Sequence, residues 1–444
     1  MDRRLFLTAL GTLTASPSIA AGTTIGLRGT LDAGENGVRP GPIDQTAGFQ
    51  RLLNRAARQD RPVYVPPGRY VVGDLDLPPR VRLMGLARSA VLAQAPGTAT
   101  ILKGTGCESV RVEGLVLEGA GHPGTDDFTG LIHLRACPQV RIEDCTLQDA
   151  GANAIALERC GGTVADCTIR RAAGLAALYA VESTGLTVRA NDIADCANGG
   201  VLVHRWKPGE DRTLVAGNRI ERIGATRGGT GQHGNGINVF QAHGVTVSDN
   251  TIADCAFSAI RGNGASNALV AANQCWRSGE TGIYAEFAFQ GSVVADNVVE
   301  GATIGISIAN FDQGGRLASC TGNLVRGLRT EGPYPPSSAG FGHGIYAEAD
   351  TVLADNVVEG APNWGLGLGW GPYLRGVVAK GNVVRASRVG AAVSVAPGAG
   401  PCLVSDNLFA DTPEGAVVPH LWLKPEGRGP QAHANVTARG NVTT

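Results

Sequence analysis

Residues 281–299 read TGIYAEFAFQGSVVADNVV, a Gly-Ile segment and a short valine strand that end at an Asn with two further valines. The pattern returns about every 25 residues, and its Asn forms one column that begins with Cys145 and Cys167. The Asn members of this column are Asn191, Asn218, Asn250, Asn273, Asn297, Asn323, Asn356, Asn382 and Asn407. Short β-branched strands with Gly-rich corners at this period predict a solenoid of stacked coils. The segments alternate at period two, which argues against helical repeats.

The Asn column is expected to lie inside the solenoid as a ladder, in which each side-chain amide bonds to backbone and to the next Asn. A ligand site made of these Asn side chains is the alternative. The ten cysteines fit the same stack, because free thiols behave as small buried hydrophobes. Cys107 and Cys137 lie in successive coils about 4.8 Å apart, so a disulfide between them stays open. No Cys-x-x-Cys pair occurs, and no metal site or cofactor is predicted.

Composition limits the class of protein. The chain has 444 residues, of which 64 are Gly, 43% are hydrophobic and 17% are charged, which excludes an intrinsically disordered protein. The formal net charge of −1 excludes a basic surface along the whole chain, so no nucleic-acid partner is predicted. No stretch approaches the ~20 apolar residues that cross a bilayer, and we predict no stable membrane anchor.

Residues 1–21 are predicted to be an export signal. Arg3 and Arg4 directly precede an apolar run over residues 5–13, and the small residues Ser18 and Ala20 mark a cleavage point before Ala21. The paired arginines followed by Phe6 resemble a twin-arginine signal. This resemblance implies recognition by the twin-arginine export machinery and a periplasmic or secreted protein. A membrane anchor or a basic N-terminus without function is the alternative.

Residues 22–100 are predicted to hold an N-terminal cap and the first strands. Asp44 precedes a segment whose apolar residues are spaced as on one face of a helix, and it is the expected N-cap. These apolar residues are Phe49, Leu52, Leu53 and Ala56. Residues 101–420 are predicted to form the β-helix and residues 421–444 an end coil or cap. The expected fold is all-β, a single-stranded right-handed parallel β-helix of about 11–13 coils with an N-terminal helical cap.

Residues 33–37, 49–57 and 65–70 resemble the opening of pectate-lyase-like proteins, in which a helix covers the end of a right-handed parallel β-helix. With its export signal, the chain is most similar to a family of twin-arginine-translocated repeat proteins without an assigned activity. Residues 342–344 read GHG, as in polygalacturonases, but the Asp pair expected one coil earlier is missing and Asn310 stands nearby. The resemblance therefore implies the fold and no mechanism.

A second strand of each coil carries the residues that are candidates for function. The segment GIYAE occurs at residues 282–286 and again at 344–348, and with Ile inward the alternate side chains point outward. The outward or adjacent residues predicted to bind substrate are His204, Asn238, Arg261, Tyr284, Asn310, Tyr346 and Trp370. Rows of rings, amides and charges suit a chain of sugar rings. The long loops 224–234 and 329–342 are expected to wall a groove there, although insertions also accumulate at tolerant corners.

The predicted catalytic residues are Glu286, Glu348, Asp312 and His343. Glu286 and Glu348 lie two coils apart, about 9–10 Å, near the ~6.5–9.5 Å separation of an inverting glycosidase pair. Asp312 is a closer partner, and His343 can serve as acid or base unless it is an unimportant loop residue. Arg261 is expected to bind a uronate carboxylate or to neutralise Glu286.

The first functional hypothesis is an exported enzyme, a hydrolase or lyase, that acts on an acidic polysaccharide through this groove. The alternative is a non-catalytic solenoid that binds glycan or envelope components through the same residues. A structural spacer is the third hypothesis, because polar and aromatic residues also occur on such a face by chance. The predicted partner of the first two is a polysaccharide or oligosaccharide.

Overall fold

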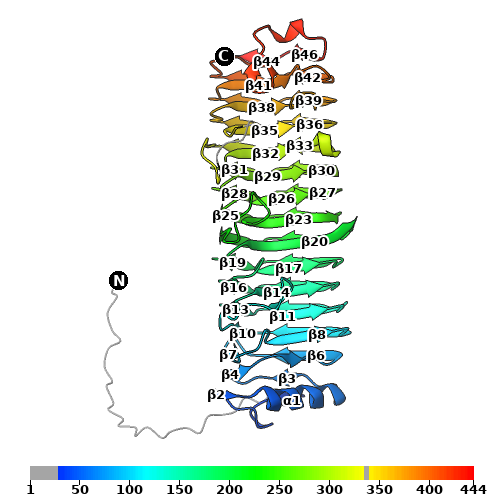
Figure 1. The fold of residues 1–444 in the computed structure, drawn as a ribbon, viewed down its shortest axis with the longest axis vertical. Coiled ribbons are helices and arrows are strands. Elements are labelled where there is room, and N and C mark those ends of the chain that lie inside the picture. Colours follow the sequence, from blue (N-terminus) through cyan, green and yellow to red (C-terminus); the bar gives the residue numbers. More distant parts are fainter. Residues whose placement is uncertain (1–28, 335–339) are drawn as a thin grey trace, which may run out of the picture.

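The computed structural model describes residues 29–334 and 340–444 and has the predicted architecture, a parallel β-solenoid (Figure 1). Each coil gives one strand to each of three sheets. Sheet A has 16 strands from β1 (Leu31–Asp32) to β46 (Val436–Arg439), and sheet B has 16 from β2 (Gly41–Asp44) to β47 (Val442–Thr443). Sheet C has 15 strands and begins at β5 (Leu75–Asp76). The predicted export signal lies outside the described residues.

The solenoid has about 15 turns, more than the 11–13 that were predicted. The count was too low because it followed the Asn column, and the first turns carry no Asn at the corner between sheets A and B. Leu115 of β10 (Leu115–Glu118) stands where Cys145 stands in the next coil, because Val116 pairs with Thr146. A Leu in this position does not mark the column in the sequence.

The Asn ladder is confirmed. The Asn297 side chain is buried, and its Nδ2 donates to the carbonyls of Val270 and Ala295 and to Oδ1 of Asn323, at 2.9–3.0 Å. Its Oδ1 accepts the backbone N–H of Asn273 at 2.9 Å. The same bonds continue past Asn407 to Asn441, one coil beyond the predicted column. All ten cysteines are free and buried, so Cys107 and Cys137 form no disulfide.

The N-terminal cap is the helix α1 (Thr46–Arg58), which lies at the first end of the solenoid in Figure 1. Its buried face consists of Phe49, Leu52, Leu53 and Ala56, as predicted. Gln45 rather than Asp44 occupies the N-cap position, although the Asp44 carboxylate accepts the Thr46 N–H at 2.7 Å. No helix within residues 29–334 and 340–444 is long and apolar enough to span a bilayer.

The C-terminal end differs from the repeating coils. Strands β44 (Val417–Leu421) and β45 (Lys424–Pro425) form an antiparallel hairpin at the end of sheet C. Strands β46 and β47 then continue sheets A and B. Residues 421–444 therefore supply a hairpin and an end coil.

Candidate functional site

Strands β26 (Ile260–Asn263), β29 (Thr281–Glu286), β32 (Ile304–Ile308) and β35 (His343–Ala347) are consecutive in sheet C. Their isoleucines fill the interior, and the register confirms the predicted outward row. This row consists of Asn238, Arg261, Tyr284, Ser307 and Tyr346. Ala285 pairs with Ile308 and Ile308 with Ala347, so Glu286 and Glu348 lie two strands apart on the same side.

The outward face is covered rather than open, which corrects the predicted groove. Glu286 is 2% exposed and Arg261 8%. Tyr334, in the loop 329–342, donates a hydrogen bond to Glu280 at 2.5 Å, and its ring stacks on Phe257 with centroids 6.1 Å apart. In the loop 224–234, Gly231 lies so close to the Arg261 guanidinium that a side chain there would clash. Tyr334 and Gly231 thus lie against the charged and aromatic side chains of sheet C.

Arg261 is paired mainly with Glu286. Its Nε and Nη2 donate to the two carboxylate oxygens of Glu286 at 2.6 and 3.0 Å, and its Nη1 lies 3.6 Å from Glu280. Burial raises the pKa of Glu286, and the Arg261 guanidinium opposes this rise. The geometry favours the interpretation that Arg261 neutralises Glu286. Nη1 of Arg261 is buried and has no hydrogen-bond partner among the described residues.

The remaining candidates surround a hollow with a volume of about 160 Å³, the Glu348 recess. Six residues predicted for the site line it: Tyr284, Asn310, His343, Tyr346, Glu348 and Trp370. Ile304, Ser307 and Ala309 complete the lining. Ser307 belongs to the predicted outward row, between the two Tyr residues, but was not among the residues predicted to bind substrate. The recess is smaller than the ~300–1,000 Å³ of ordinary ligand pockets, so it has room for one small ring.

Glu348 is the carboxyl group of the recess. Its Oε2 accepts the Phe311 N–H at 2.7 Å, and its Oε1 lies 3.3 Å from the donating hydroxyl of Tyr346. Burial raises the pKa of Glu348 to about 7, and the nearby charge of Asp312 acts in the same direction. Near neutral pH this group is present both with and without its proton, which is the condition for general acid or base chemistry.

The His343 side chain packs against the Trp364 ring and does not project into solvent. Its imidazole stacks on Trp364 with centroids 4.5 Å apart and an interplanar angle of 11°. Burial and the nearby Arg388 lower the pKa of His343 to about 4, so its imidazole is neutral at pH 7. It can exchange hydrogen bonds with a ligand in the recess but brings no positive charge.

Asp312 and Asn310 come from the segment after β32. Asp312 belongs to the short helix η1 (Phe311–Gln313) and is exposed. Asn310 has a left-handed backbone, φ 68°, and its side chain accepts the Phe287 N–H at 3.2 Å. The turn therefore presents the Phe311 N–H to Glu348 and holds Asp312 at the rim.

His204 and Asn238 do not reach the recess. His204 lies on β20 (Gly199–Glu210) in a separate row of rings, 5.3 Å from Tyr179 and 5.5 Å from Phe240. Burial lowers the pKa of His204 to about 3. Asn238, on β23 (Asn235–His243), is buried beside Arg261 in the register of the sheet.

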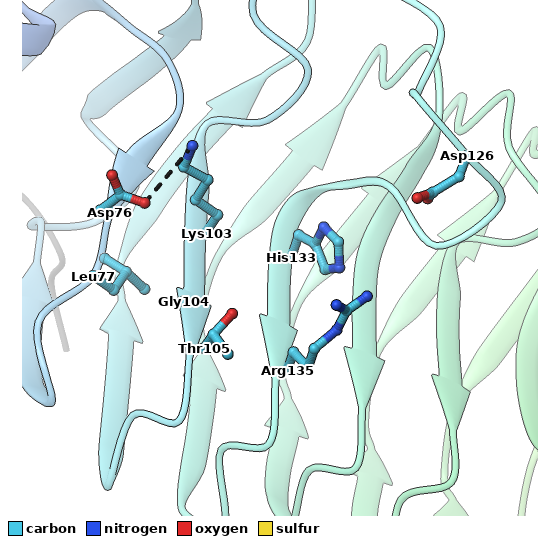
Figure 2. Close-up of a pocket in the computed structure, with 8 residues that line it drawn as sticks. All are labelled: Asp76, Leu77, Lys103, Gly104, Thr105, Asp126, His133 and Arg135. Atoms are coloured by element: carbon cyan, nitrogen blue, oxygen red, sulfur yellow. Dashed lines mark ion pairs between the residues drawn. The ribbon is translucent and has the colours of Figure 1, made fainter.

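A larger basin near the N-terminal end of sheet C was not predicted. It has a volume of about 490 Å³, and Figure 2 shows His133 and Arg135 projecting from β11 (Gly130–Arg135) beside an ion pair of Lys103 with Asp76. Arg135 in turn lies 2.6 Å from Glu158. The side chains of β11 alternate between inward and outward as in the later strands of sheet C. This alternation is the sequence signal from which the basin could have been predicted. Because its cations are already paired, the Glu348 recess is the stronger candidate.

No group of His, Cys, Asp and Glu suited to a metal ion occurs among the residues that the structure describes. The family model described as the right handed beta helix region matches residues 130–228 and 209–420. No curated protein matches the sequence.

The solved structures that are similar to this chain include two bacteriophage proteins. For the N-terminal fragment of gene product 12 from bacteriophage Phi29, the TM-score is 0.62 at 13% identity, over 93% of this chain and 70% of that one. For tailspike protein 3 of bacteriophage CBA120, the TM-score is 0.55 at 11% identity, over 93% of this chain and 61% of that one. At these identities the likeness shows the fold alone.

Proposed function

Because the chain belongs to the right-handed β-helix family, we propose that it acts on a polysaccharide at the Glu348 recess of sheet C. The observation that carries the proposal is a buried carboxyl group with its pKa raised to about 7, set among Tyr284, Tyr346 and Trp370. Such rings have an apolar face for a sugar ring and, in Tyr and Trp, a polar edge for its hydroxyls. The twin-arginine resemblance supports a site of action in the periplasm or outside the cell.

The recess favours hydrolysis of an uncharged sugar. The expectation of an acidic sugar rested on Arg261, which is paired with Glu286 and lies outside the recess. Elimination from a uronate also needs a cation to neutralise its carboxylate, and no Lys or Arg lines this recess. Protonated Glu348 is therefore assigned to donate its proton to the oxygen of the leaving sugar. Asp312 is the carboxylate left to take a proton from the attacking water.

Binding without catalysis is the second candidate, and one observation favours it. The recess contains a single carboxyl group, since Glu286 is occupied by Arg261 and Asp312 is exposed at the rim. A protein of this kind would hold a sugar by the same rings and leave its linkage intact.

The test is a set of polysaccharides and their oligosaccharides, including glucans, pectin and alginate, assayed for binding and for release of new reducing ends. An enzyme predicts that Glu348→Gln abolishes release and retains binding, while the exposed control Glu359→Gln changes neither. Binding without release by the unaltered protein, lost in Tyr284→Ala and Tyr346→Ala, would establish the second candidate. Absence of binding to the whole set would refute both.

A further inference from the structure

The hairpin of β44 and β45 ends in an apolar tip at the C-terminal side of the Glu348 recess. His420 pairs with Pro425 and Leu421 with Lys424, so Trp422 and Leu423 form a two-residue turn. Leu421, Trp422 and Leu423 are 40%, 47% and 39% exposed. Three large apolar side chains in succession are thus half in solvent at the point where the chain reverses.

Trp422 has a backbone conformation that is usually adopted by glycine. Its φ is 57°, in the left-handed region that a bulky residue rarely adopts. A two-residue hairpin turn with positive φ at its first position normally has Gly there. An unfavourable backbone conformation that is kept at a surface site suggests that the side chain itself is needed.

The Trp422 ring continues the wall of the recess. Trp370 lines the recess, and its ring centroid lies 5.2 Å from that of Trp422 at an interplanar angle of 74°. Gly371 makes room for this contact, because a Cβ there would lie 2.3 Å from the Trp422 ring. Two ring surfaces therefore adjoin, one inside the recess and one outside it.

The opposite side of the recess offers a ligand nothing comparable. Beyond Tyr284, the Arg261 guanidinium lies 5.3 Å from the Tyr284 ring centroid and is paired with Glu286. Tyr334 covers Glu280 in the same region. The Arg261–Glu286 pair is buried on this side, whereas Trp422, on the C-terminal side of the recess, is 47% exposed.

We propose that the Trp422 tip is a second sugar-binding subsite, at which an oligosaccharide whose end ring fills the Glu348 recess continues across Trp370 and Trp422. The inference rests on the proposed function. It adds the direction in which the oligosaccharide extends, because one end of the oligosaccharide occupies the recess. It assigns the ligand as an oligosaccharide of at least two rings with an apolar ring face. Stacking on an exposed Trp is the kind of contact that dominates affinity when it is present.

The experiment compares Trp422→Gly with the unaltered protein on oligosaccharide ladders of increasing length from the glycan that binds in the test above. The shortest ligand should bind both proteins equally. Longer ligands should bind the unaltered protein about tenfold more tightly than the variant, which corresponds to one interfacial ring contact. Leu423→Ala, a change at the same turn with similar exposure, should bind like the unaltered protein.

Thermal unfolding separates this role from a structural one. Gly suits the positive φ, so Trp422→Gly relieves backbone strain while it loses the contact with Trp370, and the unfolding midpoint should change little. A lowered midpoint with unchanged affinity for long ligands would make Trp422 a structural residue and overturn the inference. Equal affinity of both proteins at every length would also overturn it and leave the proposed function standing. Failure of the unaltered protein to bind any of these oligosaccharides would refute both the inference and the proposed function.

Discussion

Replacement of Glu348 by Gln should stabilise the protein at alkaline pH and leave its stability at acid pH unchanged. Glu348 is 6% exposed, and its folded pKa of about 7 lies above the ordinary value of 4.5. The folded protein therefore retains a proton that the unfolded chain releases between these pH values. This contribution to stability is fully present below pH 4.5 and is lost as the pH rises through 7.

The magnitude follows from the difference between the two pKa values. A shift of about 2.5 units corresponds to about 3 kcal/mol of unfolding free energy above pH 7. Gln resembles the protonated acid and retains an acceptor for the Phe311 N–H but has no carboxylate to desolvate. For a folded chain of this length, about 3 kcal/mol corresponds to a rise of about 3 °C in the thermal midpoint.

Thermal unfolding followed by circular dichroism between pH 5 and pH 9 measures this difference. The two curves of midpoint against pH should lie close together near pH 5, diverge as the pH rises toward 7 and keep a constant separation above pH 7, with the variant higher. Glu359→Gln, an exposed change on sheet B, should follow the unaltered protein throughout. A constant offset at all pH values, or a less stable variant at pH 8, would show that Glu348 has no raised pKa.

Three further results are expected. Asn297→Leu should cost about 1–3 kcal/mol for each backbone group that it leaves unpaired, whereas Asn441→Leu at the half-exposed end of the ladder should cost less in the same urea titration. Glu286→Gln should destabilise by about 3 kcal/mol in urea, because Arg261 loses its principal partner, and an unchanged midpoint would contradict the buried pair. Ellman's reagent should find no reactive thiol in the folded protein and ten after unfolding without reductant, and two fewer would reveal a disulfide.

The interior of the solenoid was readable from the sequence because its contacts repeat. Three features depend on contacts between a residue and its equivalent in the next coil. They are the Asn ladder, the inward isoleucines and the two-strand offset of Glu286 and Glu348. The first turns escaped the count because they have no Asn or Cys in this column, where Leu115 aligns with Cys145 of the next coil. Local periodicity thus predicts the repeating coils and undercounts those whose corner residue changes.

The candidate site was predictable only in part. Tyr284, Ser307, Tyr346 and Glu348 follow from alternation along sheet C, and the other candidates lie at the ends of its strands, but the paths of the two long loops do not follow from it. Tyr334 reaches Glu280 across 54 residues of sequence, and no period connects the two. This contact covers the face, and the pairing of Arg261 with Glu286 removes two candidates from solvent. Non-repeating long-range contacts therefore decide which outward residues remain free.

The in-register stacking of sheet C restricts how such a site can change during evolution. Distances along the face come in steps of about 4.8 Å, so Glu286 and Glu348 are held at two steps whatever happens in the loops. A different separation requires the gain or loss of an entire coil. The ladder Asn side chains bond chiefly to backbone and to Asn side chains of their own and adjoining coils, so a duplicated coil can enter without breaking the interior. The distances between site residues in this chain therefore change by gain or loss of whole coils, whereas the chemistry of the site changes by substitution of single residues.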